Sequence, residues 1–228
     1  MAAKKKIVVK GTEDVLRILC DSIANTLSTV TSSQVTYPKT FIRTNKTCLR
    51  PDIGCFVLFE GGFTGLVAMN FKANTALEIY KKFNVNMGIP ESELTNNHTS
   101  PEVADTIGEL LNQCIGQFQI NLRKELGLSV TQNQPRMVTL TQSMRISLET
   151  EIDKPQFMRV EFRTQGNNLF YLETTFEKVE FVMERTPKPK QTDCVDVDEL
   201  LENKNKLQCD KKTEENIADE DFMKKLGL

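Results

Sequence analysis

Apolar residues recur at three- and four-residue steps in three separate segments of the chain, which is the spacing of an amphipathic helix. This pattern predicts helices over residues 14–30, 73–83 and 101–125. Thr12 is the expected N-cap of the first helix, because its hydroxyl can accept a hydrogen bond from an unpaired backbone N–H of the first turn.

The third helix has the clearest boundaries. Ser100 is a preferred N-cap residue, and Pro101 suits the first helical position, where its missing N–H is not needed. Glu102 adds a negative charge near the positive end of the helix dipole. Gly127 is expected to end the helix, because glycine readily adopts the left-handed conformation found there.

Runs of β-branched and aromatic residues occupy most of the remaining apolar sequence. They predict strands over residues 53–60, 63–71, 137–149, 156–164 and 168–176. The Gly61-Gly62 turn joins the first two strands into a hairpin, and Gly166-Asn167 joins the last two. A further stretch, residues 178–183, can extend the sheet.

The composition of the chain changes after Arg185. Residues 5–185 are expected to form one α+β domain, in which an antiparallel or mixed sheet packs against a few long helices. Residues 186–228 are rich in Asp, Glu, Lys and Asn and are expected to form a flexible charged tail.

Charge and composition exclude several classes of function. The chain of 228 residues has 29 Lys and Arg against 31 Asp and Glu, which gives no positive excess for binding a nucleic-acid backbone. No apolar run approaches the ~20 residues of a membrane span, and no secretory signal is visible, so a cytoplasmic protein without membrane contact is expected.

The six cysteines contain no C-x-x-C pair and are expected to be reduced thiols. His98 is the only histidine, which argues against a histidine metal site or a catalytic triad.

The third predicted helix has one apolar and one polar face. Its polar face carries Asp105, Glu109, Asn112 and Gly116, at steps of four, three and four residues. A carboxylate and a carboxamide one turn apart on a rigid helix can enter the cleft of another molecule together. The alternative is a solvated polar face without a function.

The longer pattern Asp105-x3-Glu109-x2-Asn112, followed after 22 further residues by Pro135, resembles the signature of the CheC/CheX/FliY family of response-regulator phosphatases. The helix sequence from Asp105 to Gly116 and the hairpin strand over residues 63–71 are also similar to this family. The resemblance covers about residues 10–176 and implies a CheC-like fold.

CheC-type members carry two such helices, whereas CheX-type members carry one. In the first predicted helix, Asp21, Ser22 and Asn25 lack the Glu-x2-Asn spacing, so the resemblance is to the CheX type. It implies a homodimer joined through the sheet and a phosphorylated CheY-like receiver domain as the partner. It also implies that the chain has no cofactor of its own, because the Mg²⁺ belongs to the receiver domain.

The resemblance assigns catalysis to Glu109 and Asn112. The Asn112 amide can orient a water molecule but cannot act as a base, and the Glu109 carboxylate can pair with a lysine of the receiver domain. A receiver-binding or scaffolding module without turnover is the alternative function. A small-molecule enzyme has little support, because Gly61, Gly62 and Gly65 lie in a hairpin and not before a helix.

Four other residues are expected to support this site. Asp105 occupies the acidic position of the family pattern, although an acid in the first turns also favours the helix dipole. Gly108 and Gly116 are unfavourable inside a helix, so the close approach of another backbone, from a partner or from the chain's own sheet, is expected to compensate. Pro135 is expected to shape the loop that enters the next strand.

Two acidic-apolar segments of the predicted tail, residues 195–201 and 217–226, can each form a short amphipathic helix on a partner. The first resembles the acidic peptide with which the flagellar switch protein captures a phosphorylated chemotaxis receiver. The alternative is a tail that serves only to keep the domain soluble.

Overall fold

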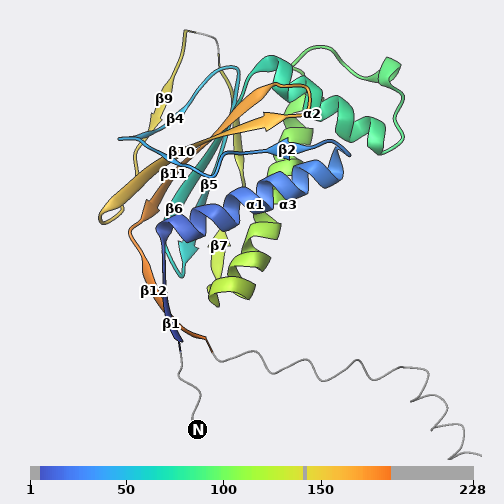
Figure 1. Cartoon of the computed structure of the whole chain (residues 1–228). Coiled ribbons are helices and arrows are strands. Elements are labelled where there is room, and N and C mark those ends of the chain that lie inside the picture. The colour runs from blue at the N-terminus through green and yellow to red at the C-terminus, as the bar shows by residue number, and fades with distance from the viewer. Residues whose placement is uncertain (1–5, 141–142, 186–228) are drawn as a thin grey trace, which may run out of the picture. The chain divides into compact units, whose positions relative to one another are not determined.

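An antiparallel β-sheet is central to the structure, a computed structural model that describes residues 6–140 and 143–185. Within these residues eight strands join in the order β2-β10-β11-β6-β5-β7, with β3 also paired to β10 and β8 to β5 (Figure 1). The strands of this sheet are β2 (Val35–Thr36), β3 (Ile42–Arg43), β5 (Ile53–Gly61), β6 (Gly65–Phe71), β7 (Val130–Gln132), β8 (Arg136–Thr139), β10 (Pro155–Thr164) and β11 (Leu169–Glu177).

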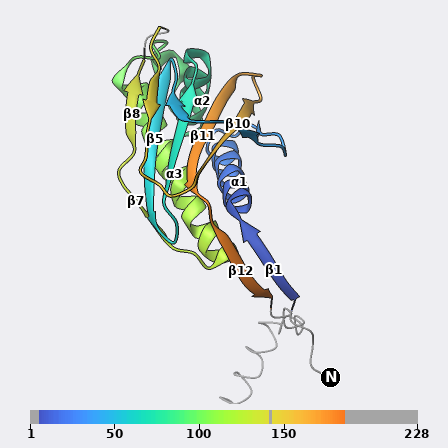
Figure 2. The same cartoon turned by 90° about the vertical axis from the view of Figure 1, so that its left-hand side faces the viewer.

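Three helices cover one face of the sheet. These are α1 (Thr12–Val30), α2 (Ala73–Asn86) and α3 (Pro101–Leu126), and a 3₁₀ turn, η1 (Glu91–Glu93), lies between α2 and α3 in the sequence. Figures 1 and 2 show α1 and α3 lying against the sheet. Alternate strand residues and the apolar helix stripes share one core, because each element must bury its apolar side. The predicted α+β fold is confirmed.

The hairpin of β5 and β6 forms as predicted, with Val57 opposite Val67. Gly65 is required where β6 passes β11, because a Cβ atom at this position would lie 2.5 Å from Cδ1 of the Phe176 ring. The Phe63 ring contacts the Phe176 ring edge to face at 5.4 Å. The glycine therefore lets aromatic side chains close this end of the core.

A short two-stranded ribbon lies on the other face of the sheet. It consists of β4 (Thr47–Leu49) and β9 (Ile146–Leu148), which pair antiparallel. Leu49 packs there with Ala68 and Leu140 in a small second core. The Thr47 and Thr175 hydroxyls are hydrogen-bonded at 2.7 Å, which fixes the ribbon to β11.

The prediction for the start of α1 was wrong. Gly11, and not Thr12, is the N-cap, and the backbone N–H of Gly11 donates to the Asp14 carboxylate at 2.9 Å. The Thr12 hydroxyl donates to the Glu177 carbonyl and accepts from the Val179 N–H instead. Contacts between distant segments thus replaced the local cap.

Two strand predictions also need correction. Residues 137–149 do not form one strand, because β8 pairs with β5 in the main sheet whereas β9 pairs with β4 in the ribbon. Residues 178–183 do not extend the main sheet, because β12 (Glu180–Arg185) pairs with β1 (Lys6–Gly11) in a separate two-stranded sheet. Helix α3 has its predicted ends, and Gly127 adopts the left-handed conformation with φ 67°.

The described chain forms one compact unit over Ile7–Glu184. The tail segments 195–201 and 217–226 lie outside the described residues. The division into a domain over residues 5–185 and a tail over residues 186–228 therefore stays a prediction.

Candidate functional site

Helix α3 presents the two faces that its sequence predicts. The buried face packs into the core and consists of Ile107, Leu110, Leu111, Cys114, Ile115 and Phe118, each at most 2% exposed. Asp105, Glu109 and Asn112 are exposed on the opposite face. The polar side chains are thus held outward by a helix whose other side is fixed in the core.

A cleft of about 410 Å³ lies beside this polar face. Its helical wall is Ala104, Asp105, Gly108, Glu109 and Asn112, and its second wall is the segment Gln134, Pro135, Arg136 and Met137. The second wall is placed by the pairing of β8 with β5, in which Arg136 lies opposite Phe56. The structure therefore brings together five of the six residues singled out from the sequence, and Pro135 directly precedes β8 as expected.

Gly116, the sixth residue, lies two turns beyond Gly108 and outside the cleft lining. A Cβ atom at Gly116 would have no neighbour within 4 Å among the described residues. At Gly108 it would lie 3.2 Å from Sδ of Met137, which is a side chain. The expected close approach of a backbone from the chain's own sheet is therefore wrong at both glycines.

The polar groups of the cleft differ in their hydrogen bonding. Oε1 of Glu109 accepts a hydrogen bond from the Gln113 amide at 3.1 Å, one turn further along the helix. The Asn112 amide has no hydrogen-bond partner among the described residues. An exposed amide on a rigid helix can donate to one group and accept from another, as the positioning of a water molecule requires.

Sequence reasoning missed four residues that line the cleft, namely Ala104, Gln134, Arg136 and Met137, and the exposed Ile120 beyond it. Arg136 and Met137 line the cleft next to Pro135. The sequence indicated them only by their position directly after Pro135. Ile120 is 62% exposed and follows Asn112 and Gly116 at steps of four residues. A single exposed apolar residue is common on protein surfaces, so Ile120 alone gave no signal of a contact surface.

The first helix does not repeat this arrangement. The Asp21 carboxylate accepts a hydrogen bond from the Tyr37 hydroxyl. Ser22 is buried, donates to the Ile18 carbonyl and accepts from the Asn121 amide at 3.0 Å. Asp21 and Asn25 are both exposed on α1, but they are four residues apart, so α1 lacks the Glu-x2-Asn spacing of α3.

The thiols of the described residues are poor nucleophiles. Cys20, Cys48, Cys55 and Cys114 are free and buried. Burial raises the pKa of the Cys55 thiol to about 12. Cys114, on the buried side of α3, also has a raised pKa because of burial. In the part of the chain that the structure describes, no group of three or more His, Cys, Asp or Glu side chains could hold a metal ion.

A family model described as "Protein of unknown function (DUF3334)" matches residues 5–228. The chain belongs to the DUF3334 family. No curated protein matches its sequence. Within the described residues of this DUF3334 member, none of the helices has the length and apolar character needed to cross a membrane.

Solved structures of chemotaxis proteins share the fold. The CheX protein of Desulfovibrio desulfuricans is 19% identical, with a TM-score of 0.59 over 72% of this chain and 99% of that one. The CheX–CheY–BeF3–Mg²⁺ complex from Borrelia burgdorferi matches at 14% identity and a TM-score of 0.54, over 72% and 98% of the two chains. FliY of Thermotoga maritima matches at 18% identity with a TM-score of 0.53, over 72% of this chain and 86% of that one. The DUF3334 chain thus has a CheC-like fold.

Proposed function

We propose that the protein is a CheX-like phosphatase that hydrolyses the aspartyl phosphate of a CheY-like receiver domain. The observation that carries this proposal is the cleft in which Glu109 and Asn112 face the segment containing Pro135. The similarity in fold to a CheX protein that was crystallised with CheY supports a receiver domain as the partner.

In the proposed reaction, a water molecule attacks the phosphorus of the aspartyl phosphate. The bond between phosphorus and the receiver's carboxylate oxygen breaks, which releases inorganic phosphate and a free carboxylate, and the proton of the water passes to the phosphate or to solvent. The transition state is loose, so the protein's main task is to position the water. The Asn112 amide has no other partner in the described structure and serves this purpose.

Glu109 has a different role in the proposal. Its carboxylate pairs with the receiver lysine next to the phosphate and fixes the docked position of α3. Gln113 holds one oxygen of this carboxylate at 3.1 Å, which limits its rotation. Asp105 adds a second negative charge to the same cleft.

The remaining features of the proposal come from the partner and from the family resemblance. The Mg²⁺ that neutralises the phosphoryl group belongs to the receiver domain, and the chain supplies no cofactor. The protein acts as a homodimer joined through its sheet, in the cytoplasm, where receiver domains of two-component and chemotaxis pathways work.

The test is the half-life of aspartyl phosphate on purified candidate receiver domains, with the full-length protein and with its variants. Asn112→Ala should reduce the stimulated release of phosphate to the background rate and leave the melting temperature unchanged or slightly higher, because the side chain is exposed and alanine favours a helix. Glu109→Ala and Glu109→Gln should both weaken docking, because the lysine partner needs a full negative charge.

Gln117→Ala is the matched control. Gln117 lies on the exposed side of α3 outside the cleft, and among the described residues its amide bonds only to Asn121, at 3.0 Å. Wild-type turnover in a folded Asn112→Ala protein would disprove the assignment of the site. Stable binding of the phosphorylated receiver without faster phosphate release would instead identify the non-catalytic receiver-binding module.

A further inference from the structure

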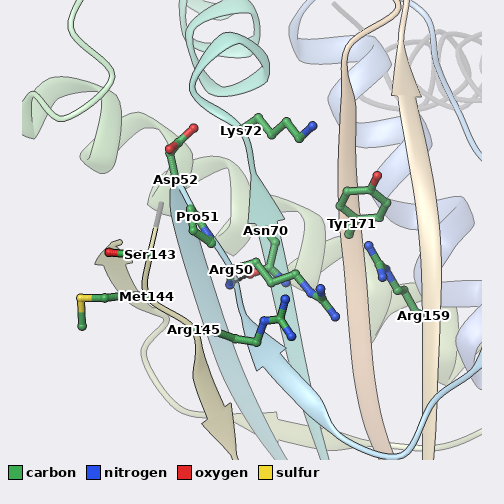
Figure 3. Close-up of a pocket in the computed structure, with 10 residues that line it drawn as sticks. All are labelled: Arg50, Pro51, Asp52, Asn70, Lys72, Ser143, Met144, Arg145, Arg159 and Tyr171. Carbon is green, nitrogen blue, oxygen red and sulfur yellow. Dashed lines mark hydrogen bonds between the residues drawn. The ribbon is translucent and has the colours of Figure 1, made fainter. Parts of the chain in front are cut away.

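A second cleft lies on the face of the sheet that the helices do not cover (Figure 3). It has a volume of about 700 Å³ and lies next to the ribbon of β4 and β9. Arg159 of β10 and Tyr171 of β11 line it from the sheet, and each alternates with residues that are buried in the core beneath the helices. Arg50 follows β4, Arg145 precedes β9, and Lys72 precedes α2. Segments far apart in the sequence therefore build this cleft.

Arginine side chains converge in this cleft. Figure 3 shows the guanidinium groups of Arg50, Arg145 and Arg159 turned toward one another. The Arg159 guanidinium also lies over the Tyr171 ring, 4.1 Å from its centroid. Stacking on the ring limits the motion of this guanidinium and keeps it in the cleft.

One buried carboxylate orients two of these arginines. Glu173 is 1% exposed, and its Oε1 lies 2.8 Å from Nε of Arg50 and 3.8 Å from Nε of Arg159. Its Oε2 accepts from the backbone N–H of Cys48 at 2.8 Å. Because Glu173 engages the Nε atoms, the terminal nitrogens of both guanidinium groups stay available, and they have no hydrogen-bond partner among the described residues.

The charges of the cleft do not balance. Its lining and base contain four cationic side chains, namely Arg50, Lys72, Arg145 and Arg159, against two carboxylates, Asp52 and Glu173. The Asp52 carboxylate accepts from the Ala73 N–H at the start of α2 and lies apart from the guanidinium groups in Figure 3. In the part of the chain that the structure describes, Lys72 and Arg145 make no ion pair. Like charges held together in this way are unfavourable unless an anion binds between them.

We propose that this cleft binds a phosphorylated small molecule of nucleotide size. Guanidinium groups recognise phosphate oxygens through paired hydrogen bonds. A ligand with a single carboxylate would carry too little negative charge to balance three guanidinium groups, whereas a phosphorylated ligand carries more. The volume falls in the range of small-molecule sites. The cleft shares no lining residue with the cleft beside α3, so this inference is independent of the proposed phosphatase activity.

The test is isothermal titration calorimetry of the full-length protein with inorganic pyrophosphate, ATP and GTP, at two salt concentrations. Arg145→Ala and Lys72→Ala should each weaken binding about tenfold, since each removes one charged donor from the ligand. Both side chains are exposed and lack partners in the described structure, so the fold should tolerate their loss. Arg50 and Arg159 are unsuitable for substitution, because their loss would leave the buried Glu173 without a full set of partners.

Arg123→Ala is the matched control, because it removes the same charge from the exposed end of α3. Equal binding of pyrophosphate and nucleotides would identify a site that recognises phosphate groups alone, whereas tighter binding of ATP or GTP would identify a nucleotide site.

Three results would overturn the proposal. The first is no binding of any of the three probes at millimolar concentration, and the second is equal affinity in Arg145→Ala and Arg123→Ala. The third is binding of a synthetic peptide of residues 193–203 in place of the phosphates, which would identify an acidic peptide as the ligand.

Discussion

Gly116 offers a direct test of whether the polar face of α3 is a contact surface. The residue lies inside a helix, where glycine costs about 1 kcal/mol relative to alanine. Because a Cβ atom there would meet none of the described residues within 4 Å, the structure provides no packing reason for the glycine. Gly116→Ala should therefore increase the free energy of unfolding by about 0.5–1 kcal/mol, which corresponds to about 1–4 °C in melting temperature for a domain of this size.

Gly108 provides the internal comparison. Alanine at this position gains the same helix propensity, but its Cβ would lie 3.2 Å from Sδ of Met137, so this side chain must shift. Gly108→Ala should thus be clearly less stabilising than Gly116→Ala. Thermal and urea unfolding of the two variants measures the difference.

Function should respond in the opposite direction to stability. If the receiver domain approaches α3 closely at Gly116, receiver affinity and phosphate release should fall from Gly116→Ala to Gly116→Met while both variants stay folded. If Gly116→Ala is no more stable than the wild type, the conclusion that a Cβ atom has free space at this position is wrong. A Gly116→Met protein with wild-type affinity and turnover would show that the partner does not approach α3 there.

Three further predictions concern the fold and the tail. Burial acts to raise the pKa of Glu78, but hydrogen bonds from Lys82 and from Thr164, at 2.6 Å, outweigh it and hold this pKa below its usual 4.5. The stability that these bonds supply is present above pH 4.5 and should be lost as the pH falls through the lowered pKa, so Glu78→Gln should flatten the acid limb of the urea-unfolding profile. Deletion of residues 187–228 should raise KM for the phosphorylated receiver several-fold with kcat unchanged in steady-state assays, whereas equal KM values would leave the tail as a solubilising segment. Iodoacetamide should not modify Cys55 in the folded protein at pH 8, as mass spectrometry can check, because burial raises its pKa to about 12.

Local signals were sufficient to predict the long elements. Helix α3 has a proline at its start, a left-handed glycine at its end and a regular apolar stripe, and these signals agree with one another. The strands β2 and β3 have two residues each, which is too short for any periodicity to appear. The N-cap of α1 was missed because the Thr12 hydroxyl bonds to segments more than 160 positions away in the sequence.

The same distinction applies to the two clefts. Helical spacing alone placed Glu109 and Asn112 on one exposed face. The position of Pro135 beside them depends on the register between β8 and β5, which no local pattern specifies. The arginine cleft could not be predicted, because Arg50, Arg145 and Arg159 come together only after the sheet and its ribbon have formed.

The hydrogen bonds of Thr12 to Glu177 and Val179 bring the start of α1 next to the end of β11. The protein is therefore suited to circular permutation, with residue 179 linked to residue 11 by a short glycine-serine segment. New termini can be opened at Asn96 and Asn97, which are exposed in the connection between η1 and α3. Such a permutant would begin just before α3 and would place a genetically fused receiver domain close to Glu109 and Asn112.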